Sequence, residues 1–433
     1  MSITAVVSGA ASGADRLAES QSADLKPTVE RLIRELDADR LAVRVQAERD
    51  LIALGPGVLA HLPAPDRTPN ASVREAIRRI RVALERRKAR DSVLPARVTL
   101  RSELPLEEAI ERIVAQTGNR LDVSGLPARL RETPFEVDYR SRSFWSALDD
   151  LARQAKFRYR YDASADVLRL LPRAETGAAG ELAVDRSGPY RLSVVSAGLR
   201  PLFGDDAHRL LRVRLRFFAE PRLRPLFLKF AADDVTARAP AGRRLEPFTP
   251  KANRELPFGE GGREIELDAN FKVPRSLAFE TIAFRGTMAI QTAAGSERIE
   301  FARLDEEGEG TAQRRGGVTV TLQKARFVKS DEGSRRARIR IAVSYDTGGP
   351  AFESHRTWIF HNKAFLETKA GRRIEPTGPF TTTLQADGAV AVEYTFADLK
   401  GTAGDFRFVY VAPTLLIEVP VEFELEDVPV SAP

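Results

Sequence analysis

The sequence predicts a multi-domain protein of the α+β and all-β classes: helical hairpins first, a βαββαββ domain next and two duplicated β-sandwiches last. Apolar residues follow helical spacing before about residue 95, strand spacing after about residue 189, and both spacings in alternation between them. A heptapeptide also recurs, as AGRRLEP at Ala241–Pro247 and AGRRIEP at Ala370–Pro376, with Gly371 lying 129 residues after Gly242. A repeat of this length predicts a duplicated domain.

The composition limits the class of protein and the kinds of site that the chain can form. The chain has 433 residues, of which 43% are hydrophobic and 30% charged, as in ordinary globular proteins. It contains no cysteine, which excludes disulfides, thiolate metal sites and cysteine nucleophiles. The net charge of +6 is small beside 67 basic and 61 acidic residues, so most charges are expected on solvated faces. No apolar run approaches the ~18 residues that a membrane-spanning helix needs.

Residues 1–25 are small and polar, and residues 26–92 have helical periodicity. The first segment is expected to be a disordered tail; the alternative is a degraded or mis-started secretory signal, although it lacks a basic n-region. In the second segment, Thr28 is the expected N-cap of the first helix, and Gly55-Pro56 ends the next one. The rhythm Val-Arg-x-x-Ala-x-x-x-Leu from Val43 to Leu51 resembles a HEAT repeat.

The last of these helices, expected over residues 72–90, is strongly basic. It carries eight Arg and Lys residues against Glu75 and Glu85. Such a helix either contacts a polyanion or presents a solvated face, and we expect the solvated face. No aromatic residue interleaves the arginines, so stacking on single-stranded nucleic acid has no platform, and nucleic acid is not an expected partner.

Residues 95–172 follow the order βαββαββ. Two helices have apolar stripes, and the strands alternate. The stripes and strands are formed by Leu106, Ile110, Ile113; Phe144, Leu148, Leu151; and Val98, Leu100, Val137, Tyr139, Phe157, Tyr159. Both helices are expected on the same side of the sheets, with Leu148 buried and a strand edge left open.

This domain resembles the secretin and TonB short N-terminal (STN) domain. The resemblance lies in Pro105–Ala109 and Gln116–Gly118 around the first helix, the second helix at 144–151, and the aromatic hairpin at 157–171. In that family the domain docks a partner protein in the periplasm, ahead of a β-barrel receptor or a secretin channel. This chain has neither of those, so the resemblance implies protein docking and carries no transport role.

Two copies of a β-rich unit are expected at 189–304 and 317–430, after a linker at 173–188 and with the acidic segment 305–310 between them. Each offers about seven alternating strands with Gly, Pro, Asp and Asn turns, which is typical of immunoglobulin-like sandwiches. In the last strand, apolar residues at odd positions from Leu415 to Leu425 alternate with glutamates. Pro420 lies on the outward phase, which predicts an edge strand or a bulge.

Three groups of polar residues were weighed as sites. His355 and His361 lie six apart, without a third ligand in phase, and are expected to be surface or turn residues. Asp233-Asp234 suggests a calcium loop, but Asn362-Lys363 stands at the corresponding place in the second copy.

The arginines of the heptapeptides are the third group. Arg243-Arg244 and Arg372-Arg373 are either anion contacts or exposed residues of tight turns in which Gly242 and Gly371 take positive φ, and the turn is preferred. We therefore predict no catalytic, cofactor-binding or metal-binding residues.

The predicted function is that of a non-enzymatic, envelope-associated adaptor or scaffold that binds other proteins, with a periplasmic location implied by the STN resemblance. The alternative is a polysaccharide-binding or carbohydrate-active accessory protein. That alternative needs exposed aromatic platforms, and the chain offers only Trp145 and Trp358 as tryptophans. The identity of the partner and the oligomeric state stay open.

Overall fold

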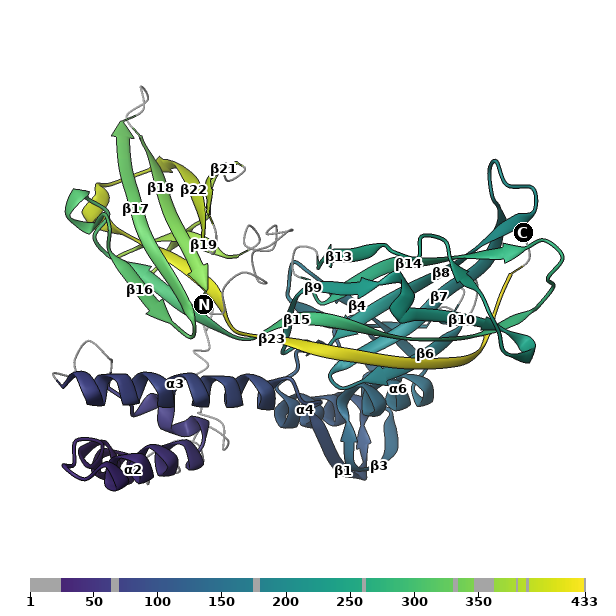
Figure 1. The fold of residues 1–433 in the computed structure, drawn as a ribbon, viewed down its shortest axis with the longest axis horizontal. Coiled ribbons are helices and arrows are strands. Elements are labelled where there is room, and N and C mark those ends of the chain that lie inside the picture. The colour runs from purple at the N-terminus through teal and green to yellow at the C-terminus, as the bar shows by residue number, and fades with distance from the viewer. Residues whose placement is uncertain are drawn as a thin grey trace, which may run out of the picture. The chain divides into compact units, whose positions relative to one another are not determined.

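The structure is a computed structural model that describes residues 25–63, 70–173, 180–258, 262–329, 334–345, 362–378, 381–386 and 389–431. The chain divides into two compact units, Met1–Asp91 and Ser92–Pro433 (Figure 1). It is mostly β, with several sheets and a few helices, so the expected multi-domain α+β architecture holds at this level. Among the described helices, none is long and apolar enough to cross a membrane.

The first unit is helical. It contains a helix over residues 25–35, α2 (Leu41–Ala53) and α3 (Ala71–Ser92), which closes the unit and ends just beyond it. Gly55 ends α2 with a φ of 89°, as expected, and a 3-10 turn follows at Pro56–Ala60. The prediction that Thr28 caps the first helix is wrong, because Thr28 lies inside a helix that already includes residue 25. Pro27 fits within a first turn, where its missing N–H has no helical partner to lose.

Residues 97–172, which we call the α/β module, contain the elements of the expected order and one short extra helix. The elements are β1 (Arg97–Pro105), α4 (Leu106–Thr117), β2 (Leu121–Asp122), α5 (Ala128–Glu132), β3 (Pro134–Ser143), α6 (Phe144–Gln154), β4 (Phe157–Asp162) and β5 (Val167–Pro172). β1 pairs with β3 in one sheet, and β2, β5 and β4 form a second sheet in that order. The extra helix α5 was not expected.

Both long helices of the module cover a single face of the β1–β3 sheet. Val98 and Val137 on that sheet are buried in one core with Ile110 of α4 and Leu148 of α6, which is 0% exposed. The opposite face of the sheet is exposed, as the alternating burial of both strands shows. The prediction that the helices share one face is therefore confirmed.

Each group of C-terminal strands packs one sheet of its own against part of a shared sheet. We call these two layered units the first and the second sandwich, and residues 183–431 together the β region. The first sheet contains β12 (Glu246–Pro247), β14 (Glu264–Pro274), β8 (His208–Ala219), β7 (Tyr190–Pro201) and β6 (Ala183–Ser187). The second contains β16 (Ala312–Arg315), β17 (Val318–Lys329), β18 (Arg335–Tyr345), β22 (Ala389–Leu399) and β21 (Thr381–Ala386). The expected linker at 173–188 is corrected in part, because Ala183–Ser187 pair with β7 across Gly188, whose φ is 58°.

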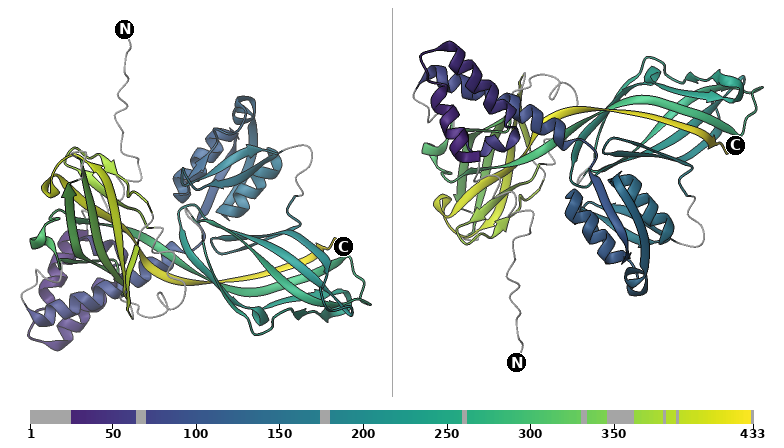
Figure 2. Two further views of the ribbon diagram at one scale, coloured as in Figure 1. Left: turned by 90° about the horizontal axis from the view of Figure 1, so that it is seen from above. Right: turned by 90° about the horizontal axis from the view of Figure 1, so that it is seen from below.

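The shared sheet has eight strands. Its path is β11 (Arg243–Arg244), β10 (Val235–Ala239), β15 (Thr281–Phe301), β23 (Phe406–Pro429), β19 (Ala364–Thr368) and β20 (Arg373–Ile374); β9 (Arg224–Ala231) also pairs with β15, and β13 (Asn253–Pro257) pairs with β9. The long strands β15 and β23 run side by side from one group of strands to the other (Figures 1 and 2).

The two hydrophobic cores exchange these long strands. The first core, around β7, β8 and β14, takes Val421 and Phe423 from the end of β23. The second core, around β17, β18 and β22, takes Ile299 and Phe301 from the end of β15. The expected limits 189–304 and 317–430 therefore follow the sequence repeat but do not separate the cores. The reason is length, since strands of 21 and 24 residues far exceed the usual 3–10.

The two heptapeptides occupy corresponding hairpins. Gly242 lies between β10 and β11, and Gly371 lies between β19 and β20, at opposite ends of the path through the shared sheet. Their φ angles are 74° and 79°, so the predicted positive φ is confirmed at both glycines. In the β15–β23 ladder, Gln291 faces Glu418, which is 127 residues further along the chain. This distance equals the sequence offset between Thr287–Ile290 and Thr414–Ile417, so the ladder is centred on a pair of matched positions.

Pro420 lies on an edge, as the alternation predicted. In this half of β23, β15 is the single strand partner among the described residues. The Glu422 N–H donates to Ser187 Oγ at 3.1 Å, and the Glu424 N–H donates to Asp185 Oδ2 at 2.9 Å, so these N–H groups point away from β15. Because backbone direction repeats every two residues, the missing N–H of Pro420 is also on the open side and costs the ladder no hydrogen bond.

We predict that Gly242→Ala and Gly371→Ala each lower the free energy of unfolding by about 1 kcal/mol or more, because L residues are disfavoured at these φ values. No atom outside the immediate chain neighbours lies within 4 Å of a Cβ added at either glycine, so the cost is conformational. Urea denaturation of both variants measures it. Gly404→Ala is the control, since Gly404 also has open space but no positive φ. Stability equal to wild type in both hairpin variants would contradict the prediction.

Candidate functional site

Of the four histidines, His61 and His208 lie among the described residues. His208 Nδ1 lies within hydrogen-bonding distance of Asp205 Oδ1, at 2.9 Å. His355, His361 and Trp358 lie outside the described residues. Within the described part of the chain, no group of three or more His, Asp or Glu residues could hold a metal ion.

Asp233 and Asp234 are exposed in a short turn, where Asp234 accepts a hydrogen bond from the Ala231 N–H at 3.2 Å. Asn362, at the position that the sequence repeat aligns with Asp233, is buried instead. It accepts a hydrogen bond from Arg224 at 2.6 Å and donates one to the Tyr410 hydroxyl at 2.6 Å. These positions therefore have different surroundings in the two copies.

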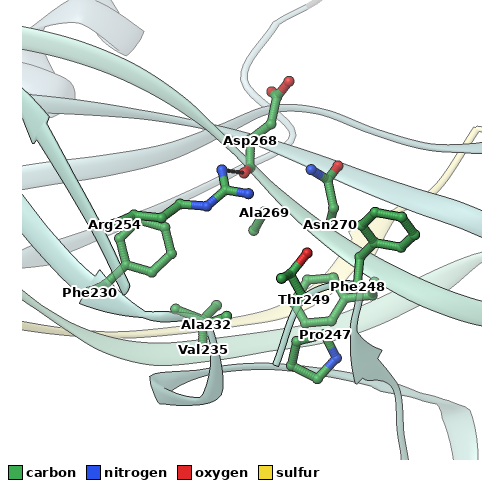
Figure 3. Close-up of a pocket in the computed structure, with 11 residues that line it drawn as sticks. Phe230, Ala232, Val235, Pro247, Phe248, Thr249, Arg254, Asp268, Ala269 and Asn270 are labelled. Carbon is green, nitrogen blue, oxygen red and sulfur yellow. Dashed lines mark hydrogen bonds between the residues drawn. The ribbon is translucent and has the colours of Figure 1, made fainter. Parts of the chain in front are cut away.

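A small apolar cleft opens at the side of the first sandwich (Figure 3). Its walls come from β9, β14 and the loop after β12, with Phe230, Phe248 and Phe271 among the lining residues. Arg254 lies at its mouth and donates to the Asp268 carbonyl oxygen at 3.5 Å. The enclosed volume is about 20 Å³, which admits about one water molecule. The amide oxygen of Asn270, which lines this cleft, is buried without a hydrogen-bond partner among the described residues.

A much larger groove of about 470 Å³ lies on the solvent face of the shared sheet, over β10, β15 and β23. Small residues, Thr281 and Ala283, form its floor. Arg238 of β10 lines one side and acidic residues of β23 line the other, while Arg285 lies on the central strand β15, directly opposite Glu424. The groove is completed by Ala239, Pro240, Gly242, Ile282, Glu426 and Asp427. Its volume is within the range of small-molecule sites, and it presents both signs of charge. This groove is the strongest candidate for a binding site among the described residues.

A buried polar cluster joins the α/β module to the first sandwich. Glu220, which follows β8, is 0% exposed and accepts hydrogen bonds from the Ala96 N–H at 2.9 Å, Asn119 Nδ2 at 3.2 Å and Arg222 Nε at 2.6 Å. Arg222 also donates to the carbonyl oxygens of Ser92 and Leu94. Burial raises the pKa of Glu220, and the charge and hydrogen bond of Arg222 oppose that rise.

Aromatic contacts complete this junction. Trp145 of α6 is 1% exposed, donates from Nε1 to the Pro189 carbonyl oxygen at 3.0 Å, and lies 6.0 Å from the ring of Phe218. Arg191 of β7 bridges to Asp149 of α6 at 3.0 Å. The module is thus fixed to the sandwich by groups that are mostly withdrawn from water.

Sequence reasoning missed both the groove and the junction. Arg238, Arg285 and the glutamates of β23 read as ordinary outward-facing charges, because nothing local shows that their strands are neighbours. Glu220 gave a weak signal, as a carboxylate placed directly after the apolar run Phe217–Ala219 and before Pro221. Such a position does not by itself indicate a buried acid, because the sequence does not show which groups surround it.

Comparison with known proteins adds no family. No protein-family model and no curated protein matches the chain. Among solved structures, a conserved domain protein from Bacillus anthracis is similar at 8% identity over 59% of this chain and 95% of its own, with a TM-score of 0.16. The protein pT26-6p is similar at 8% identity over 59% of this chain and 66% of its own, with a TM-score of 0.17. These scores are too low to support an argument about fold or function.

We predict that Glu220→Gln lowers the free energy of unfolding at pH 7 by about 1–3 kcal/mol, because an amide NH2 group replaces one of the two carboxylate oxygens that accept from Ala96, Asn119 and Arg222. The raised pKa of Glu220 also gives wild type a contribution that is complete below the unfolded-state pKa near 4.5 and is lost as the pH rises through the folded-state pKa. The glutamine variant lacks this contribution. Urea denaturation from pH 7 to pH 4.5 should show the stability gap widening as the pH falls; a constant or narrowing gap would contradict it.

Proposed function

We propose that this protein is a non-enzymatic adaptor that docks another protein on the β1–β3 sheet of the α/β module. The observation that carries the proposal is that this sheet has two strands and no further strand pairs with either edge in the part of the chain the structure describes. Extended segments of partner proteins bind such edges through backbone hydrogen bonds.

The free backbone groups can be assigned from the ladder. Leu106 N–H donates to the Thr133 carbonyl oxygen at the end of the β1–β3 pair, at 3.1 Å. In an antiparallel ladder every second residue bonds to the partner strand, so the N–H groups of Val137 and Tyr139, like the Thr133 backbone, point toward β1. The N–H groups of Glu136 and Asp138 point outward. Glu136 and Asp138 also have exposed side chains, so an approaching strand meets no apolar cover on this edge.

The junction with the first sandwich also supports an adaptor role, because it leaves the β1–β3 sheet uncovered. It covers the part of the module around Trp145, Tyr159 and Tyr161, whose ring contacts and hydrogen bonds reach Phe218 and Arg263. The β1–β3 sheet is on the other side of the helices from these contacts and keeps one exposed face. A partner bound there would be held at a fixed orientation to the β region.

We further infer that residues 95–172 are related to STN domains, that residues 26–92 are HEAT-like, and that the β region is a duplicated pair of immunoglobulin-like sandwiches. The order of strands and helices in the module, the matched hairpins at Gly242 and Gly371, and the pairing of Gln291 with Glu418 support these relationships. The STN relationship is also the reason for proposing a periplasmic or envelope-associated location.

Polysaccharide binding is the second candidate and has less support. Sugar sites in β-sandwiches use exposed aromatic platforms. Trp145 is buried, and neither described pocket presents a Trp or Tyr; the fully exposed Phe203 and the half-exposed Phe248 are isolated from the large groove.

The proposal predicts that Asp138→Pro abolishes partner docking with little loss of stability, because it removes an outward N–H that the β1–β3 ladder does not use. Asp138→Ala keeps that N–H and should bind as wild type does. The measurement is quantitative recovery of partner from an envelope fraction, with the partner identified by photo-crosslinking from position 140 and by mass spectrometry.

Leu148→Ala separates docking from folding. It should cost about 2–5 kcal/mol through a cavity in the module core. Equal recovery of the crosslinked partner by wild type and Asp138→Pro, at unchanged stability, would contradict docking on this edge.

A further inference from the structure

The two heptapeptide hairpins place different charges at the same cross-strand position. In the first hairpin, Arg238 of β10 lies directly opposite Arg244 of β11. In the second, Glu367 of β19 lies directly opposite Arg373 of β20. Opposite charges at such a position stabilise a sheet, and like charges destabilise it. The first hairpin therefore carries a local cost that the second avoids.

The second hairpin satisfies its charges internally. Glu367 is paired with both Arg298 and Arg407, and Arg373 lies over the ring of Phe365 at 4.7 Å. In the first hairpin, neither Arg238 nor Arg244 has a carboxylate within 4.0 Å among the described residues, and Arg238 Nε is buried without an acceptor among them. Arg238 also lines the groove on the solvent face of the shared sheet, where an anion from outside the chain can approach its side chain.

The groove that Arg238 lines can hold such an anion. Across the small floor of Thr281 and Ala283 stand Glu424, Glu426 and Asp427. Asp427 has a φ of 50° beside the irregular register between Ile282 and Phe284, so the strand is distorted at the rim of the groove. Arg238 and the acidic residues of β23 thus flank the central strand β15 on opposite sides, without ion pairs between them within 4.0 Å among the described residues.

We propose that this groove binds a short extended peptide segment that carries an acidic side chain toward Arg238 and a basic side chain toward Glu426 and Asp427. A simple anion would meet the carboxylates of β23, and a simple cation would meet Arg238 and Arg285. A segment with both charges meets an opposite charge at each end. In an extended chain, residues two apart point the same way about 7 Å apart, which suits a Glu-x-Lys segment lying along the floor. This site is separate from the β1–β3 edge and does not depend on docking there.

The test uses the full-length protein and two synthetic peptides, acetyl-Glu-Ala-Lys-amide and acetyl-Gln-Ala-Gln-amide, with titration calorimetry at low ionic strength. Wild type should bind the charged peptide and not the neutral one, and binding should weaken as salt is added. Arg238→Glu, which copies the charge pattern of the second hairpin, should weaken binding at least about tenfold, a loss of about 1.4 kcal/mol. Its melting temperature should stay unchanged or rise, because the like-charge pair is removed.

Arg372→Gln is the matched control. It changes an arginine of the second heptapeptide that lines neither pocket, so binding should equal wild type. The proposal is overturned if the neutral peptide binds equally well, if acetate alone binds as tightly as the charged peptide, or if both arginine variants lose binding to the same degree. A clear fall in the melting temperature of Arg238→Glu would overturn the argument from like charges.

Discussion

β15 and β23 pair along their whole course from Thr281↔Pro429 to Phe301↔Phe408, with one irregularity in register between Ile282 and Phe284, and each core of the β region takes part of its wall from this ladder. One half of each strand serves the first core, and the other half serves the second. Neither core can be assembled from its own sequence repeat, because its buried surface includes residues that belong to the other repeat. The ladder therefore makes the β region a single cooperative structure, whatever the order in which its parts form.

The same constraint explains how the two halves can share an arrangement and differ in chemistry. Backbone pairing fixes the places of the hairpins at Gly242 and Gly371, while side chains on the solvent face are free to vary. In the second hairpin, Glu367 is paired with Arg298 and Arg407. The first leaves Arg238 beside Arg244 at the rim of a groove. An unsatisfied charge on one of two otherwise matched hairpins points to a ligand more strongly than the same charge would alone.

The fold was predictable from the sequence where the signal is local. Helical stripes in the module, positive φ at Gly242 and Gly371, and the edge position of Pro420 each follow from a few neighbouring residues. The exchange of strands did not follow, because alternation shows which face of a strand is buried and not which core receives it. The apolar residues Val421 and Phe423 read as the core of the second copy and are in the first. The length of the alternating pattern was the overlooked indication, since Thr281–Phe301 can be read as alternating over more residues than one sandwich needs.

Candidate sites were harder still. The junction around Glu220 joins groups that lie about 100 residues apart in sequence, such as Asn119 and Glu220. The groove joins β10, β15 and β23, which are distant along the chain. In both places the residue types are common ones, and they can be identified as a site only from their contacts in the folded structure. Nothing in spacing or composition marks Arg238 apart from the other arginines of the sequence.

The most direct test of the shared ladder is native-state hydrogen exchange in wild type and Phe423→Ala. By sequence Phe423 belongs to the second copy, but its ring lies 5.4 Å from that of Phe284 in the first core. Truncation of a buried Phe costs about 3–5 kcal/mol, so exchange should accelerate in β8 and β14, which belong to the first copy. Unchanged protection in β8 and β14, with loss confined to β17, β18 and β22, would contradict the exchange of strands between the two cores.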